Sequence, residues 1–313
     1  MFKLYRADGS DFTQFSEMIR NLETFLNSKF EFDGKDWNEQ LDLIVNHQSG
    51  DGSFSIVDTL HIEADAFFSF CNYPTVLCNA IMIKAVLLCP EKYESLLPAL
   101  SMGLQASAKM GLEGHGYDAL DGLFDCIKIY SKSGLLFFLE KYPEIAPEFT
   151  KCIKAVTDFM VTCIREKSFI YGFNVNYEMK IRIAELNLTH KPLFTYGTLM
   201  EGERNHHFMD EQPLPDDASI YGYNLFDLGS FPGIRPSNHK DRTVKGEVYL
   251  VGDVALSQIN ILESEGVLYK MTYVEDWIGD ISQIAGVYVY NRKVPKNARI
   301  ESGYWRTREK GRN

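Results

Sequence analysis

The stretch that decides the fold of the C-terminal part reads Phe194-Thr195-Tyr196-Gly197-Thr198-Leu199-Met200. Aromatic and β-branched residues lead into a glycine, a pattern that is typical of a strand ending in a turn. Consecutive backbone N–H groups at such a turn can cradle an anion or a carbonyl oxygen. The polar residues 201–207 predict that a helix starts next. By itself, the segment Tyr196–Leu199 indicates an ordinary turn.

Away from this stretch, the periodicity of the apolar residues divides the chain. From about Phe12 to Ile164 they recur at helical spacing, and glycine or proline breaks separate the segments. Beyond residue 190, short runs predict strands. These runs are Leu193–Tyr196, Ser219–Phe226, Val244–Val251, Tyr269–Val274 and Gly286–Tyr290. One apolar segment, Leu256–Leu262, predicts a helix among them.

The sequence therefore predicts two domains. Residues 1–188 form an all-α helical domain, and residues 189–313 form an α/β (α+β) domain, a small mixed β-barrel with a helix packed on it. The segment Asn187–Pro192 reads as the linker between them. Just before it, alternating apolar residues from Phe169 to Tyr177 predict a strand.

The composition narrows the class of protein. A formal net charge of −11 argues against binding to nucleic acid or to an anionic membrane surface. The most apolar stretch, Ala66–Cys89, is interrupted by polar residues, so we expect buried helices there and no membrane span. The first residues show no apolar signal region, and we expect a cytoplasmic protein. The six cysteines lack metal-binding spacing, which predicts reduced thiols in the core.

Two further segments complete the C-terminal pattern. The run Val244-Lys245-Gly246-Glu247-Val248-Tyr249 predicts a strand with a carboxylate in it. The run Ile259-Asn260-Ile261-Leu262-Glu263-Ser264 places a second carboxylate at the end of an apolar helix, and Tyr269 follows it. The apolar residues beside Glu263 are compatible with a raised pKa of its carboxyl group. Without the neighbouring segments, Glu263 would be interpreted as a solvated residue at a helix end.

In order and spacing, these segments resemble the gamma-glutamylcyclotransferase-like family over residues 189–313. The resemblance implies that Tyr196, Gly197, Thr198 and Leu199 form the substrate loop. It implies that Glu263 is the catalytic residue, that Tyr269 binds substrate, and that Ser302–Trp305 form a terminal strand. Glu247 resembles a structural or entry carboxylate of the family. Glu265 competes with Glu263 but lies outside the motif.

The activity implied by the resemblance is the cyclisation of a γ-glutamyl group to 5-oxoproline with release of a free amine. The substrate is then a γ-glutamyl amine, peptide or protein conjugate. One carboxylate suffices for the proton transfers, so no metal or other cofactor is required. Two positions depart from the family pattern: Asn260 stands in place of Asp, and Met271 (or Lys270) in place of Arg. The alternative is a ligand-binding module that keeps the cleft without the chemistry.

The N-terminal half carries weaker signals. The segment Gln48–Phe54 resembles a helix-end motif of α/α-toroid proteins such as terpene cyclases, where its role is structural. Asp118, Asp121 and Asp125 share a helical face, but no second acidic motif supports a diphosphate enzyme, and a solvated face explains them. The adjacent His206 and His207 point about 100° apart on a helix and are poor metal ligands. We assign this half no reaction; our hypothesis is that it recognises or presents the substrate.

Overall fold

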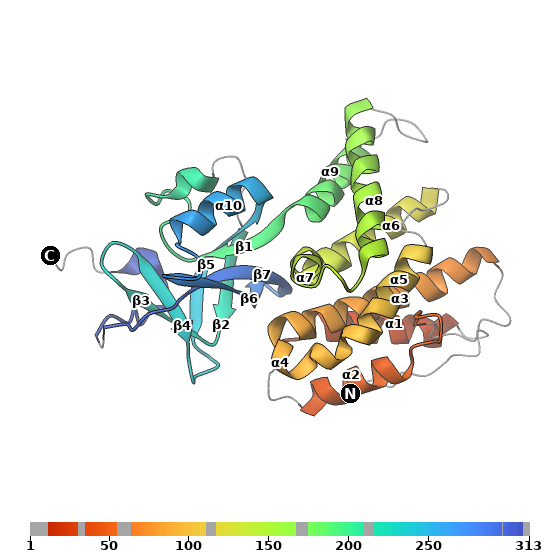
Figure 1. Cartoon of the computed structure of the whole chain (residues 1–313), viewed down its shortest axis with the longest axis horizontal. Coiled ribbons are helices and arrows are strands. Elements are labelled where there is room, and N and C mark those ends of the chain that lie inside the picture. Colours follow the sequence, from red (N-terminus) through yellow and green to blue (C-terminus); the bar gives the residue numbers. More distant parts are fainter. Residues whose placement is uncertain are drawn as a thin grey trace. The chain divides into compact units, whose positions relative to one another are not determined.

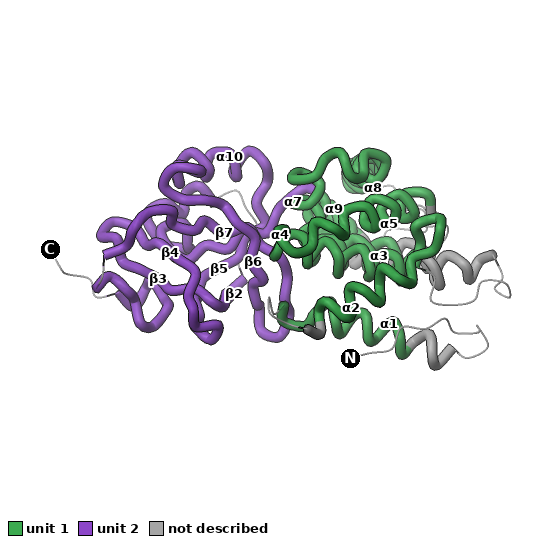
Figure 2. Tube along the Cα trace, turned by 60° about the horizontal axis from the view of Figure 1, so that its bottom comes forward, with its two compact units in different colours: residues 1–188 green, residues 189–313 purple. Residues whose placement is uncertain are grey.

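The computed structural model describes residues 12–30, 35–54, 64–110, 117–166, 175–209, 216–295 and 297–308. The chain divides into two compact units, Met1–Leu188 and Thr189–Asn313 (Figure 2). The first unit is helical, and the second is built on a closed five-stranded mixed barrel (Figure 1). The predicted fold class, a helical domain followed by a small mixed β-barrel, is thereby confirmed.

A buried helix forms the centre of the first unit. Every residue from 74 to 87 of α3 is buried, as expected of a helix that is apolar on all sides. It packs against α1, α5, α6 and α7. The described elements of this unit are α1 (Phe12–Leu26), α2 (Lys35–Asn46), α3 (Ala64–Leu88), α4 (Pro90–Tyr93), a 3₁₀ helix (Glu94–Leu96), α5 (Leu97–Met110), α6 (Tyr117–Lys132), α7 (Leu135–Lys141), α8 (Pro147–Glu166) and α9 (Val175–Thr189).

The segment that follows α2 has a structural role, as its sequence predicts. Gln48 Nε2 donates hydrogen bonds to the carbonyl of Ala99, at 2.8 Å, and to that of Gly52, at 3.1 Å. The carboxylate of Asp51 accepts hydrogen bonds from the backbone and hydroxyl of Ser53. Phe54 is buried behind this turn. The segment therefore ties the end of α2 to the start of α5.

Five of the six cysteines lie among the described side chains, and all five are free thiols. Burial raises the pKa of the Cys126 thiol to about 12, which leaves it protonated and unreactive at neutral pH. Cys71 lies outside the described side chains, as do Asp118 and Asp121 of the acidic face.

The strand predicted between Phe169 and Tyr177 is wrong where it can be compared. Residues 167–174 lie outside the description, but Val175 and Tyr177 belong to the first turns of α9. The residues after Tyr177 are rich in helix formers. Their preference for a helix outweighs the alternation of nine residues that predicts a strand. The predicted linker is also short, because α9 ends at Thr189 and the first strand begins at Lys191.

The barrel has the strand order β1-β5-β2-β6-β7, in which β1 closes the ring by pairing parallel to β7. All other neighbours in the ring are antiparallel. A hairpin and a helix, α10, accompany the barrel. The elements are β1 (Lys191–Thr195), β2 (Asp216–Tyr221), β3 (Tyr223–Asp227), β4 (Pro232–Pro236), β5 (Thr243–Val251), α10 (Asp253–Leu262), β6 (Tyr269–Ile278) and β7 (Ile281–Tyr290).

Three predictions of local structure in this unit are wrong. The single strand predicted over Ser219–Phe226 is divided into β2 and β3 at Gly222, whose φ of +79° ends the extended run. The helix predicted to begin at residue 201 is a series of turns, followed by a 3₁₀ helix over His206–Met209. The terminal strand predicted over Ser302–Trp305 is a single bridge followed by a 3₁₀ turn, and it buries Trp305 in the barrel core.

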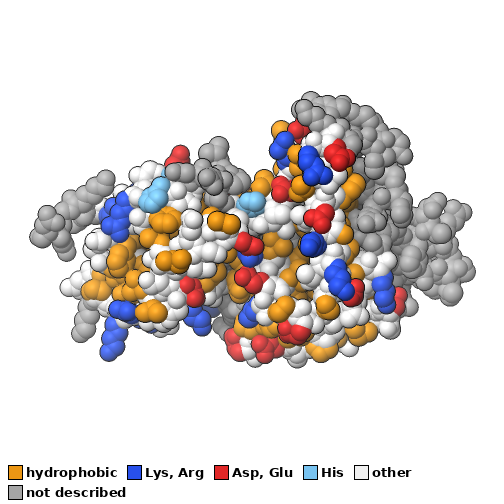
Figure 3. All heavy atoms as spheres, turned by 45° about the horizontal axis from the view of Figure 1, so that its top comes forward, with side chains coloured by type: hydrophobic (Ala, Val, Ile, Leu, Met, Phe, Trp, Pro, Cys, Tyr) orange, Lys and Arg blue, Asp and Glu red, His pale blue; other side chains and the backbone are white. Residues whose placement is uncertain are grey.

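The described surface mixes residue types. On the face drawn in Figure 3, acidic and basic side chains alternate with apolar ones. Within the described residues, no helix combines the length and the apolarity that a bilayer crossing demands.

A close approach between β1 and β5 at Gly246 leads to a stability prediction. A Cβ atom on Gly246 of β5 would overlap the carbonyl oxygen of Thr195 in β1 and lie 2.8 Å from the ring of Phe194. We expect Gly246→Ala to lower the free energy of unfolding of this unit by roughly 2–4 kcal/mol, because backbone cannot move aside cheaply. Urea unfolding, followed by hydrogen exchange of the β1 and β5 amides, measures this loss.

The matched control is Gly252→Ala, whose added Cβ meets nothing closer than 3.4 Å, at His190. We expect it to cost about 0.5–1 kcal/mol, clearly less than Gly246→Ala, because Gly252 is the N-cap of α10 and alanine caps a helix less well than glycine. Equal effects of the two substitutions would contradict the assignment of Gly246 to a close strand crossing.

Candidate active site

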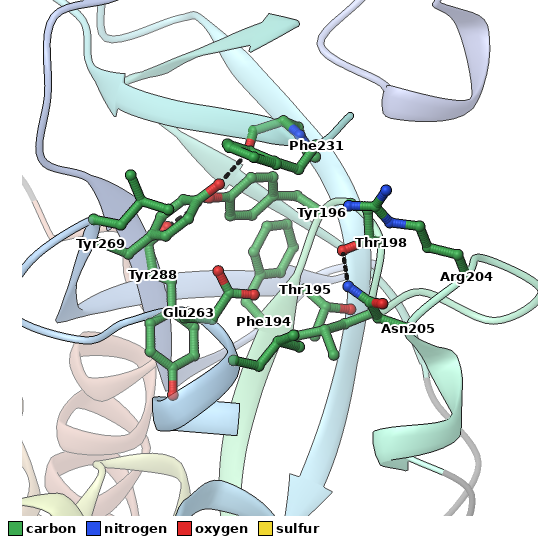
Figure 4. A pocket seen from close by; sticks show the side chains of 15 residues that line it. Phe194, Thr195, Tyr196, Thr198, Arg204, Asn205, Phe231, Glu263, Tyr269 and Tyr288 are labelled. Carbon is green, nitrogen blue, oxygen red and sulfur yellow. Dashed lines mark hydrogen bonds between the residues drawn. The ribbon is translucent and has the colours of Figure 1, made fainter. Parts of the chain in front are cut away.

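A cavity of about 120 Å³ opens beside the end of β1. Its walls come from elements that are far apart in the sequence: the end of β1 and its turn (residues 194–199), residues 204–205, the start of β4, the end of α10, the start of β6, and Tyr288 of β7 (Figure 4). The predicted site residues Tyr196, Gly197, Thr198, Leu199, Glu263 and Tyr269 all line it. Barrel closure thus brings together residues that the sequence separates by more than sixty positions.

The turn after β1 is held in a fixed shape. Gly197 packs so closely on Pro232 that a Cβ atom would overlap the proline ring. Asn205 fixes the other side, because its backbone N–H donates to the Thr198 carbonyl at 2.9 Å and its side chain donates to the Thr198 hydroxyl at 3.0 Å. Among the described residues, the N–H groups of Gly197, Thr198 and Leu199 have no acceptor. They are therefore available to an oxygen of a ligand.

Glu263 follows the last turn of α10 and points into the cavity. Its backbone N–H donates to the carbonyl of Ile259 at 2.9 Å, which fixes it as the residue that ends the helix. In Figure 4 its carboxyl group lies among the aromatic rings of Phe194 and Tyr269. Among the described residues, nothing donates a hydrogen bond to this carboxyl group. Burial without a compensating partner raises the pKa of Glu263 to about 7.

The three tyrosines around the cavity direct their hydroxyl groups away from Glu263. Tyr196 donates to the carbonyl of Tyr288 at 2.6 Å, and Tyr269 donates to the carbonyl of Pro232 at 2.5 Å. Tyr288 donates to Asn260 Oδ1 at 2.6 Å. Burial raises the pKa of all three phenols well above the usual value, so they stay neutral. They surround Glu263 with rings and leave its carboxyl group without a hydrogen bond from them.

The competitor Glu265 lies elsewhere. It is exposed, does not line the cavity, and accepts a hydrogen bond from the backbone of Met271 at 3.3 Å. Met271, which replaces the expected arginine, packs against the apolar cluster beneath α10, whereas Lys270 is exposed. The geometry therefore favours Glu263 over Glu265 as the residue that can act on a ligand in the cavity.

An ion pair between a buried carboxylate and an exposed arginine holds the far end of the turn, and the sequence pattern does not predict the arginine. Glu247 is 4% exposed and binds Arg306 at 2.7 Å. Its second oxygen accepts from the backbone N–H of Glu201 at 2.7 Å and from the Tyr249 hydroxyl at 3.1 Å. Arg306 in turn donates to the carbonyl of Glu201 at 2.5 Å. The pair therefore binds both polar backbone groups of one residue, just after the turn that lines the cavity.

No metal centre is found at this site. His206 Nδ1 lies 3.3 Å from the carbonyl of Leu199 and 3.4 Å from the hydroxyl of Tyr249, and His207 is exposed. Within the described part of the chain, no group of three His, Cys, Asp or Glu side chains is placed to hold a metal ion.

The fold and the site define a small barrel with an enclosed carboxyl group opposite a turn of free N–H donors. A family model described as "Gamma-glutamyl cyclotransferase, AIG2-like" matches residues 193–307. The Escherichia coli K12 gamma-glutamylcyclotransferase family protein YtfP is 36% identical over 118 residues, which are 38% of this chain and 98% of that protein. A putative gamma-glutamylcyclotransferase of Vibrio cholerae is 36% identical over 114 residues, 36% of this chain and 93% of that protein.

The name of one relative includes a substrate. This relative is the gamma-L-glutamyl-butirosin B gamma-glutamyl cyclotransferase of Niallia circulans, 40% identical over 72 residues, which are 23% of this chain and 44% of that protein. The solution structure of ytfP from Escherichia coli matches at 35% identity with a TM-score of 0.31, over 37% of this chain and 97% of that one. Through its C-terminal unit, the chain belongs to the gamma-glutamylcyclotransferase family.

The raised pKa of Glu263 predicts how stability depends on pH. Between the usual carboxyl pKa of about 4.3 and the folded value of about 7, the unfolded chain ionises while the folded protein keeps the proton. The free energy of unfolding therefore falls as the pH rises through this window. We expect Glu263→Gln to gain about 1–3 kcal/mol of stability over wild type between pH 5 and pH 8, allowing for partial exposure.

Urea unfolding of wild type and Glu263→Gln at both pH values measures this change. Glu265→Gln is the matched control, since it makes the same chemical change at an exposed position outside the cavity. A stability difference between wild type and Glu263→Gln that is the same at both pH values would show that burial does not disfavour the charged form.

The ion pair predicts how well the turn is ordered. We expect Glu247→Gln to weaken the hydrogen bonds that hold the backbone of Glu201, because the charge that binds Arg306 is lost while the shape of the side chain is kept. The Glu201 amide should then exchange with solvent about tenfold faster or more. Glu301→Gln, which removes an exposed partner of Arg299, is the control. Unchanged exchange at Glu201 would show that the pair does not hold the turn.

Proposed function

We propose that the C-terminal unit cyclises γ-glutamyl groups to 5-oxoproline and releases the free amine. The observation that carries this proposal is the enclosed Glu263 carboxyl group, which has a pKa near neutrality and faces a turn with free N–H donors. The family membership of the chain supports the reaction class. The relative from Niallia circulans, by its name, acts on a γ-glutamyl conjugate in this way.

Glu263 is the proton carrier of the proposed reaction. It accepts a proton from the α-ammonium group of the substrate, and the free amine attacks the carbonyl carbon at the other end of the same γ-glutamyl group. A C–N bond forms and closes a five-membered ring. Glu263 returns its proton to the leaving nitrogen, and the C–N bond to the released amine breaks. The carboxylate then takes the second proton from the ring nitrogen and passes it to the released amine, which leaves as an ammonium ion. Atoms and charges balance without water or a redox partner.

The turn and the shape of the cavity supply the remaining assistance. The N–H groups of Gly197, Thr198 and Leu199 stabilise negative charge on the carbonyl oxygen as the amine adds. The attack is intramolecular, so a cavity that folds the γ-glutamyl group onto itself provides much of the rate. Rings such as those of Phe194 and Tyr269 exclude water from the reacting atoms.

The proposal is tested by measuring 5-oxoproline by mass spectrometry after incubation with a panel of γ-glutamyl amines and peptides. We expect release by wild type and a loss of about 10²–10⁴-fold in kcat in Glu263→Gln, because the amide cannot carry a proton. For wild type, kcat/KM should fall below a pH of about 7, where Glu263 becomes protonated in the free enzyme.

Glu265→Gln, an exposed carboxylate two residues away, should keep wild-type activity. Full activity in Glu263→Gln would refute the assignment of the proton carrier. Binding of 5-oxoproline without turnover of any panel member would instead favour the alternative, a ligand-binding module that keeps the cavity.

A further inference from the structure

Arg204 lies in the same cavity and has no place in the reaction described above. It belongs to the turns between β1 and the 3₁₀ helix at His206–Met209, and its side chain is exposed. Figure 4 shows its guanidinium group beside Thr198, on a different side of the cavity from Glu263. Arg204 is therefore a solvent-exposed residue of the cavity wall.

The guanidinium group of Arg204 is free to bind a ligand. Among the described residues, it has no ion-pair or hydrogen-bond partner. The neighbouring carboxylate of Glu203 is engaged with Arg308, at 3.7 Å. The backbone on either side is fixed, since Asn205 bonds to Thr198 and the His206 N–H donates to the Glu203 carbonyl at 3.1 Å. A fixed backbone with an unpaired fork of donors suits the recognition of a carboxylate.

The two charged groups of the cavity act on different parts of a substrate. Figure 4 places the guanidinium group of Arg204 and the carboxyl group of Glu263 on different sides of the cavity. In the proposed reaction the γ-glutamyl group folds into a compact ring next to Glu263, and its own α-carboxylate stays on that ring. The released amine is the part that extends away from the ring, and Arg204 lies on the other side of the cavity from Glu263.

We propose that Arg204 binds a carboxylate of the released amine, so that the site prefers γ-glutamyl amino acids and peptides to conjugates of uncharged or cationic amines. This inference rests on the cyclisation proposed above. The guanidinium group of Arg204 supplies the positive charge and the paired donors that such a carboxylate requires.

The test compares two substrates that differ only in this carboxylate: γ-glutamyl-alanine and γ-glutamyl-ethylamide. For wild type, kcat/KM should favour γ-glutamyl-alanine by about tenfold or more, the size expected of one charge-assisted contact that is partly screened by solvent. In Arg204→Met the preference should disappear, because kcat/KM for γ-glutamyl-alanine falls while that for the ethylamide stays within about twofold. Arg204→Lys should keep part of the preference, since it keeps the charge without the planar fork.

Arg292→Met is the matched control, because Arg292 is exposed in the same unit and does not line the cavity. It should leave both substrates unaffected. An equal loss for both substrates in Arg204→Met would overturn the proposal and assign Arg204 to the α-carboxylate of the γ-glutamyl group. No loss for either substrate would overturn it by showing that the guanidinium group contacts neither.

Binding to the Glu263→Gln variant separates this inference from the proposed reaction. Calorimetric titration of Glu263→Gln, with and without Arg204→Met, measures the affinity for both conjugates without turnover. A preference for γ-glutamyl-alanine that Arg204→Met removes supports carboxylate recognition, even if wild type releases no 5-oxoproline and the reaction proposal fails. Equal affinities for the two conjugates in Glu263→Gln refute it, even if wild type is an active cyclotransferase.

Discussion

Closure of the barrel at β1 is the constraint on which the site depends. β1 pairs with β5 on one edge and with β7 on the other, and its last residue continues directly into the turn that lines the cavity. The register on the β5 side sets Thr195 opposite Glu247, so a carboxylate stands where it can bind the backbone of Glu201. On the β7 side, the Tyr196 hydroxyl reaches the carbonyl of Tyr288. The turn is therefore held from both edges, and its N–H groups are left free.

The second constraint concerns Glu263, whose carboxyl group is largely enclosed and receives no hydrogen bond from the described residues. Buried carboxylates are normally paired or hydrogen-bonded, because the charged form loses its hydration. Around Glu263 the tyrosines satisfy their hydroxyl groups with backbone carbonyls and with Asn260, and only their rings remain for the carboxyl group. The folded state is less stable near neutral pH for this reason. Such a cost is typical of a group whose proton affinity is set for a reaction.

The sequence predicts most of the fold where the periodicity is long and unbroken. The apolar segment Leu256–Leu262 and the run Val244–Val251 correspond closely to α10 and β5. The failures are local and have identifiable causes. Gly222 divides a run that is apolar on both sides, and α9 extends over residues whose alternation is too short to outweigh the helix formers that follow.

The site itself is only partly visible in the sequence. The carboxylate at the end of an apolar helix and the glycine turn can be recognised as segments, and their order indicates a family. The role of Glu247 cannot be read in this way, because it depends on Arg306, fifty-nine positions away, reaching the same turn. Arg204 is equally hidden, since the turns at residues 200–205 read as the start of a helix in the sequence. Only the three-dimensional path of the chain shows that both residues face the turn or its cavity.

Asn260, where this chain departs from the family pattern, bears on both the orientation of Tyr288 and the pKa of Glu263. The family resemblance predicts an aspartate there, three residues before Glu263. In this chain, the Asn260 side chain accepts the hydrogen bond of the Tyr288 hydroxyl through Oδ1, which an aspartate oxygen would also do. An aspartate, however, would add a second negative charge near Glu263, and like charges raise the pKa of a carboxyl group. Asparagine keeps the acceptor that orients Tyr288 and removes the charge, so burial alone sets the pKa of Glu263 near neutrality.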